Sequence, residues 1–126
     1  MKSLALILLC LMPMAGADPL TGKWQLVELK GKPIPANLKK PFIQFTKPGG
    51  RIEGSGGCNR FGASFKKSKS SIQFGAMSAT MMECLGPEMK IEDEFLKSLS
   101  LKLTFKLRQG DLYFYEGNTI VMRLKR

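Results

Sequence analysis

The most regular stretch of the chain is residues 101–125, which read LKLTFKLRQGDLYFYEGNTIVMRLK. Apolar residues take every second position in three runs, at 101–107, 112–114 and 120–124, and a period of two is typical of strands with one buried face. The pairs Gln109-Gly110 and Gly117-Asn118 separate the runs and favour tight turns. The stretch therefore predicts an antiparallel three-stranded meander with one face on the core.

The same alternation assigns side chains to the two faces of the meander. The apolar positions of the first and third runs are expected to face the core: Leu101, Leu103, Phe105, Leu107, Ile120, Met122 and Leu124. The cations between them are expected on the solvent face: Lys102, Lys106, Arg108, Arg123 and Lys125. This face is a candidate surface for binding an anionic partner.

N-terminal to the meander, the chain reads as short strands separated by glycine, proline and lysine. We expect strands at 24–30, 42–45, 61–65 and 72–74, and residues 51–54 lead into a glycine-rich segment. Pro33 and Pro35 exclude a central strand from the segment around them.

One segment has the pattern of a helix. Gly86-Pro87-Glu88 places proline at a first helical position and an acid in the first turn. Ile91, Phe95 and Leu99 then recur every fourth residue, so we expect a helix that covers the open side of the sheet and buries Phe95. The acids Glu92, Asp93 and Glu94 are interpreted as its solvated face.

Together these elements predict a single mostly β domain of the α+β class at residues 18–126. Its expected architecture is a small antiparallel β-barrel-like sheet with one covering α-helix and the C-terminal three-strand meander. Residues 1–17 are interpreted as a secretory signal, because Lys2 precedes a short apolar run and Ala15-Gly16-Ala17 forms a cleavage site. The run is too short to span a membrane, and bulky Ile7-Leu8-Leu9 disfavour lipoprotein anchoring through Cys10.

Signal removal leaves two cysteines, Cys58 and Cys84, for which we expect a disulfide in an oxidising compartment. The chain has no histidine, so catalytic systems that need an imidazole are excluded, and two cysteines alone make a poor zinc site. We expect no enzyme activity, no metal and no cofactor. Four methionines, Met77, Met81, Met82 and Met89, are interpreted as packing around the helix and loop, with soft-metal binding as the alternative.

Cys58 lies in a glycine-rich segment, residues 54–62, which reads GSGGCNRFG. A phosphate-binding loop would need a helix after the glycines, whereas the pattern here predicts a strand. Asn59 is expected to stabilise its own turn, or to take part in binding. Arg60 is expected either to pair with an acid such as Glu53 or to project outward as a recognition side chain.

Residues 57–61, Gly-Cys-Asn-Arg-Phe, followed by Ala79-Thr80-x-Met82-x-Cys84, resemble the META/HslJ domain family. The resemblance covers essentially residues 20–125 and implies a small antiparallel β domain with one helix and paired cysteines. It implies an association with heat shock and, in some members, with motility or virulence, but no catalytic activity. Members commonly carry a basic residue where this chain has Met81.

Three functions remain open from the sequence. The first is an exported, non-catalytic binding domain of the envelope or stress-response type. The second is an inhibitor of a secreted hydrolase that presents the loop from Cys58 to Phe61. The third is an electrostatic binder of anionic envelope components through the cations of the meander, consistent with the formal charge of +10. We expect a monomer in the periplasm or secreted, with an unknown protein or anionic envelope component as partner and no nucleic acid.

Overall fold

The computed structural model describes residues 18–46 and 49–126. The predicted signal segment, with Cys10, lies outside the described residues, so both the signal and the exclusion of lipid anchoring stay predictions. Within the described part, no helix is long and apolar enough to cross a membrane.

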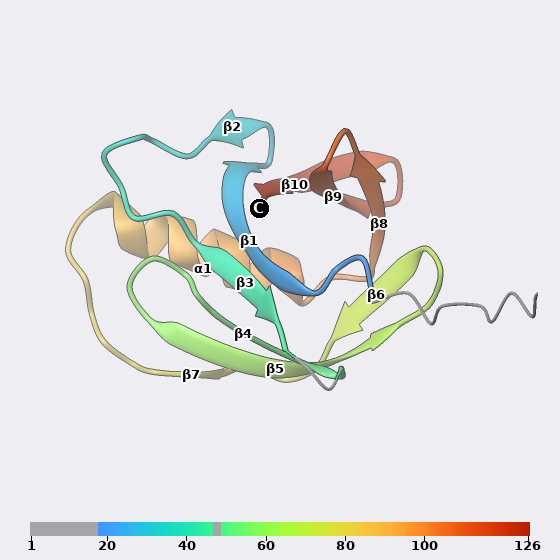
Figure 1. Ribbon diagram of the computed structural model, residues 1–126. Coiled ribbons are helices and arrows are strands. Elements are labelled where there is room, and N and C mark those ends of the chain that lie inside the picture. Colours follow the sequence, from blue (N-terminus) through green and yellow to red (C-terminus); the bar gives the residue numbers. More distant parts are fainter. Residues whose placement is uncertain (1–17, 47–48) are drawn as a thin grey trace, which may run out of the picture.

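Eight antiparallel strands close into a barrel (Figure 1). In order around the barrel they are β1 (Gly22–Leu29), β3 (Phe42–Phe45), β4 (Arg51–Ser55), β5 (Arg60–Lys67), β6 (Ser71–Phe74), β8 (Leu103–Arg108), β9 (Asp111–Glu116) and β10 (Thr119–Lys125). Strand β10 pairs back onto β1, which closes the ring. Two short strands lie outside it: β2 (Lys32–Pro33) pairs with β1, and β7 (Ser78–Ala79) pairs with β5. The predicted fold class is confirmed.

Inward-facing side chains from the strands and the helix form one continuous core. Trp24 is buried there, and its indole N–H donates to the carbonyl oxygen of Leu20 over 2.9 Å, so this large side chain leaves no polar atom unpaired. Phe74 and Phe114 pack edge to face across the barrel, with ring centroids 6.1 Å apart. The outward positions of the same strands stay polar, as the alternation predicted for most of them.

The helix α1 (Pro87–Leu99) lies across one end of the barrel. Gly86 has a φ of 90°, and Pro87 begins the helix as expected. Phe95 is fully buried, and its ring packs edge to face on Phe61 with centroids 5.8 Å apart. The helix therefore covers an end of a closed barrel and not, as predicted, the open side of a sheet.

Two face assignments in the meander are wrong. Leu107 is 41% exposed. Strand β8 pairs with β6 only through Leu103 and Thr104, so β6 does not reach Leu107. At Leu107 the only neighbouring strand is β9. In β10 a bulge between Ile120 and Met122 shifts the register, so Ile120 is 40% exposed while Val121 is buried. A bulge adds one residue to a strand and so moves the alternation by one position.

Candidate functional site

Cys58 and Cys84 form the expected disulfide, with Cα atoms 6.1 Å apart and a sequence separation of 26. Cys58 belongs to the turn between β4 and β5, and Cys84 belongs to the segment between β7 and α1. The bond therefore ties a tight turn at the end of the barrel to a segment that has little secondary structure of its own.

We expect the double substitution Cys58→Ser with Cys84→Ser to lower the free energy of unfolding by about 3 kcal/mol, since the crosslink restricts the unfolded chain. Urea denaturation of the oxidised protein and the variant measures this difference. The mass of the folded, non-reduced protein should also be two hydrogens below the reduced mass, and free thiols in folded protein would contradict the bond.

Behind the disulfide, a buried carboxylate of the helix binds the turn. Glu92 is 2% exposed and accepts hydrogen bonds from the main-chain N–H groups of Cys58 (3.1 Å) and Asn59 (2.5 Å). It also accepts one from the Asn59 side-chain amide over 2.7 Å. The interpretation of Glu92 as part of a solvated face is therefore wrong: the carboxylate replaces water as the acceptor for a turn that the helix covers.

Asn59 has a second role, because its side chain also binds the segment before Cys84. Its Oδ1 accepts from the Thr80 hydroxyl (2.9 Å) and from the Met82 N–H (2.7 Å), and its Nδ2 donates to the Met82 carbonyl (3.0 Å). Asn59 is 5% exposed. It stabilises a neighbouring segment more than its own turn, and its amide is not accessible to a partner at the surface.

The sequence contained a pattern that indicates the burial of Glu92. Glu92, Phe95 and Leu99 are spaced at i, i+3 and i+7, which places the glutamate on the same helical face as the two buried apolar residues. Gly56 is the matching position in the turn, because a Cβ there would lie 2.3 Å from the Glu92 Cγ. The glycine thus allows the carboxylate to approach the turn closely.

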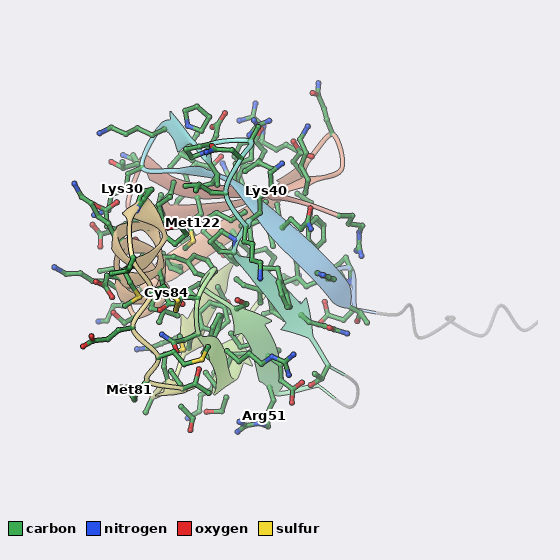
Figure 2. All side chains as sticks on the ribbon, turned by 90° about the vertical axis from the view of Figure 1, so that its left-hand side faces the viewer. Lys30, Lys40, Arg51, Met81, Cys84 and Met122 are labelled. Carbon is green, nitrogen blue, oxygen red and sulfur yellow. A yellow bond between two sulfur atoms is a disulfide. The ribbon has the colours of Figure 1, made fainter. Side chains whose placement is uncertain are left out.

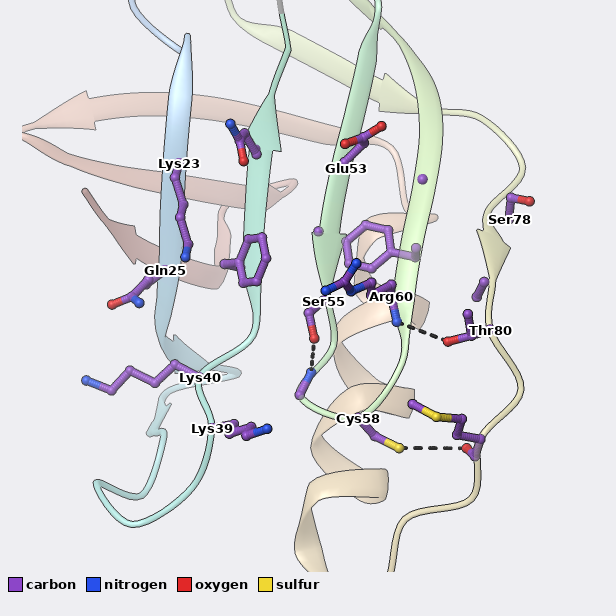
Figure 3. A pocket seen from close by; sticks show the side chains of 18 of the residues that line it. Lys23, Gln25, Lys39, Lys40, Glu53, Ser55, Cys58, Arg60, Ser78 and Thr80 are labelled. Carbon is purple, nitrogen blue, oxygen red and sulfur yellow. Dashed lines mark hydrogen bonds between the residues drawn. The ribbon is translucent and has the colours of Figure 1, made fainter.

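The outer face of β1, β3, β4, β5 and β7 is hollowed into an open groove of about 1050 Å³ (Figure 3). The outward side chains form rows across the strands. One row follows the pairing of Gln25, Phe42, Ser55 and Arg60, and a second follows that of Lys23, Gln44, Glu53 and Gly62. The ring of Phe42 is half-buried, with the Lys23 Nζ 4.2 Å from its centroid.

Cations dominate this groove. Five exposed basic side chains line it, Lys23, Lys39, Lys40, Arg51 and Arg60, against one acid, Glu53. Within residues 18–46 and 49–126 none of these six groups forms an ion pair. Arg60 therefore projects outward and does not pair with Glu53, while its main-chain N–H donates to the Thr80 hydroxyl over 3.1 Å.

Sequence comparison places this architecture in a family. The chain matches the META domain over residues 18–126. The chain belongs to the META domain family. An NMR structure of one protein has a TM-score of 0.68 at 22% identity, covering 87% of this chain and 95% of the other. The NMR structure of a protein from Burkholderia xenovorans has a TM-score of 0.66 at 19% identity, covering 91% and 96%. These likenesses show the fold, and no curated protein matches the chain.

The second basic surface of this META domain is weaker than the sequence suggested. Lys102, Lys106 and Arg108 are exposed, although Lys102 precedes β8 and so lies outside the strand. Arg123 is not a free cation: it contacts Glu28 at 2.8 Å and Asp111 at 3.3 Å. Burial is the largest single influence on the pKa of Arg123 and lowers it, but the charge and hydrogen bond of Glu28 together with those of Tyr113 outweigh it, so the pKa is raised and the guanidinium stays charged.

The methionines of the domain separate into two pairs. Met77 packs against the core and Met89 is half-buried, as the packing interpretation requires. Met81 and Met82 are instead exposed, so for these two the packing interpretation is wrong. Among the described residues, no group of three or more cysteines, aspartates and glutamates is arranged to hold a metal ion.

Proposed function

We propose that this META domain is an exported, non-catalytic binding domain that holds an anionic envelope component in the groove on its outer face. The observation that carries the proposal is the charge of the groove, where five basic side chains face one acid without ion pairs among the described residues. A concave surface of one charge sign concentrates and orients ligands of the opposite sign.

The chemistry of the groove favours phosphate or carboxylate groups displayed on a surface or a polymer. Arg51 and Arg60 supply guanidinium groups that can bind such oxygens in a bidentate manner. A Cβ at Gly62 would lie 3.4 Å from the Arg51 Nη2, so the missing side chain leaves room for Arg51 to lie across the strand. The groove is broad and open, which suits an extended ligand better than an enclosed small molecule.

The groove is a better anion site than the meander. Glu28 and Asp111 neutralise Arg123, whereas among the described residues the five cations of the groove form no ion pair.

Two double charge reversals compare the surfaces at equal net charge. We expect Arg51→Glu with Arg60→Glu to weaken binding to phosphatidylglycerol vesicles and to lipopolysaccharide by at least roughly 30-fold, since each cation lost near an anionic surface costs about 1 kcal/mol and the new acids add repulsion. Lys102→Glu with Lys106→Glu is the matched control and should change binding by less than about threefold. Co-sedimentation at two salt concentrations measures both effects.

Comparing the two ligands shows whether the groove prefers a phospholipid surface or a polyanionic glycolipid. The two salt concentrations test whether the binding is electrostatic. Equal losses in the two double variants would show that net charge alone determines binding. A loss confined to the control would assign the site to the meander. Either result contradicts the assignment of the groove as the anion-binding site, provided that the melting temperatures of the variants stay close to that of the original protein.

A further inference from the structure

The segment between β7 and the helix exposes apolar side chains on a firmly held main chain. Met81 is 92% exposed and Met82 is 56% exposed. In Figure 2 Met81 lies at the edge of the molecule, on the same segment as Cys84. A large apolar side chain exposed to this degree has no role in the core, so its exposure needs a different explanation.

The main chain on both sides of Met81 is fixed to the barrel. On one side, the Thr80 N–H donates to the Arg60 carbonyl over 3.0 Å, and its hydroxyl donates to the Asn59 Oδ1. On the other side, the N–H and the carbonyl of Met82 are both bound by the Asn59 side chain. Cys84 is anchored two residues later by the disulfide. Within the described residues, the N–H and carbonyl of Met81 itself form no hydrogen bond.

We propose that residues 80–84 form the reactive-site loop of an inhibitor of serine endopeptidases, with Met81 entering the primary specificity pocket of the enzyme. Such an enzyme binds a loop in extended form, takes one side chain into its pocket and places the adjacent carbonyl in its oxyanion hole. The exposed side chain of Met81 and its carbonyl, which has no hydrogen bond among the described residues, meet the second and third requirements. The extended form of the loop is part of the proposal. The inference does not rest on the ligand of the groove, although Thr80 and Met82 line the groove as well.

Rigidity explains why the loop would inhibit the enzyme and not simply be digested. Attack by the catalytic serine on the Met81 carbonyl carbon breaks the bond to the Met82 nitrogen, which takes a proton from the enzyme. Asn59 holds Met82 by two hydrogen bonds, and the disulfide links Cys84 to the barrel, so the new amine stays beside the acyl group. The amine can re-form the peptide bond by displacing the serine oxygen from the acyl group, and the proton returns to that oxygen; water competes with the amine for the same carbon. A loop already fixed in its bound form also loses little entropy on binding.

The side chain of Met81 selects the class of enzyme. It is long, unbranched and uncharged, so it suits an apolar pocket such as that of chymotrypsin and not the pocket of trypsin, which carries an aspartate. The location differs from the predicted inhibitory loop, which extended from Cys58 to Phe61. There Asn59 and Phe61 are buried, so this turn supports the exposed loop from behind.

The test measures inhibition of chymotrypsin, elastase and subtilisin by the purified protein, with trypsin as the reference. We expect competitive inhibition of at least one of the three enzymes. Met81→Arg should weaken that inhibition by at least about 30-fold, as for the loss of a central interface residue, and create inhibition of trypsin. Ile120→Arg is the matched control, because Ile120 is an exposed apolar residue on β10, away from the loop. It should leave the inhibition unchanged.

A second variant separates an inhibitor from a substrate. Thr80→Val removes the hydroxyl that binds Asn59, and we expect faster cleavage between Met81 and Met82, with the two pieces still joined by the disulfide until reduction. Three results would overturn the proposal: no inhibition of any of the three enzymes with no gain against trypsin, inhibition that Met81→Arg leaves unchanged, or rapid turnover of the original loop.

Discussion

Glu92→Ala is expected to lower the free energy of unfolding by roughly 4 kcal/mol. The carboxylate accepts three hydrogen bonds from the turn at Cys58 and Asn59 in a site that is 2% exposed. A hydrogen bond to a charged group contributes about 1.5–3 kcal/mol, and buried donors left without an acceptor cost free energy in addition, although water recovers part of the loss. Urea denaturation followed by circular dichroism measures the change.

Asp93→Ala is the control for this prediction. Asp93 is the next residue of the same helix and carries the same type of charge, but its side chain is exposed. Its removal should change the free energy of unfolding by less than about 0.5 kcal/mol. If the two variants were equally stable, the carboxylate of Glu92 would not be what holds the turn.

Leu103→Lys is expected to unfold the domain. Leu103 is 2% exposed and pairs with Ile72 of β6, at one of the two edges where the β8–β9–β10 meander joins the rest of the barrel. Its replacement loses about 2–3 kcal/mol of apolar burial and introduces a charge that costs several kcal/mol to bury. The sum is comparable with a typical total stability of about 5–15 kcal/mol.

Lys106→Glu tests the opposite face of the same strand. Lys106 is exposed and its closest favourable contact is the ring of Tyr115, so its loss should cost at most about 1 kcal/mol. Far-ultraviolet circular dichroism and thermal melting compare the two variants. Similar melting temperatures would contradict the assignment of β8 to an inner and an outer face.

The regular part of the fold could be predicted because local patterns determine it. Period-two alternation located β8, β9 and β10, and the start at Gly86-Pro87 located the helix to the residue. The observed strand β3 has the predicted bounds. In β3 and β9, in the helix and in β8 as far as Phe105, the side chains that face the core follow the period of the element itself, so no knowledge of the neighbours was needed.

Exposure at the margins of these elements could not be predicted in the same way. Leu107 continues a perfect alternation, yet it is exposed because the neighbouring strand β6 ends before reaching it. Ile120 does the same, yet a bulge in β10 turns it outward. Strand length and register depend on pairing between segments that are distant in the sequence. The alternation within one strand carries no information about that pairing.

The candidate site depends even more on tertiary structure. Lys23, Arg51 and Arg60 come from three strands, and the pairing of β1, β3, β4 and β5 brings them to one face. Arg60 was a candidate from the sequence, but the cations that surround it were not, and the other candidates were the meander cations Lys102, Lys106 and Arg108. Likewise Asn59 was identified as a candidate, but its bonds to Thr80 and Met82 connect segments more than twenty residues apart.

The location of an anionic ligand can be observed residue by residue. The measurement is a nitrogen–proton correlation NMR titration of the isotopically labelled protein with a soluble short-chain phosphatidylglycerol. We predict that the largest saturable shifts fall on the amides of Gln44, Glu53, Arg60 and Gly62, on the outer face of β3, β4 and β5. Shifts confined to residues 102–108, or the absence of saturable shifts in the groove, would contradict the assignment of this face as the binding surface.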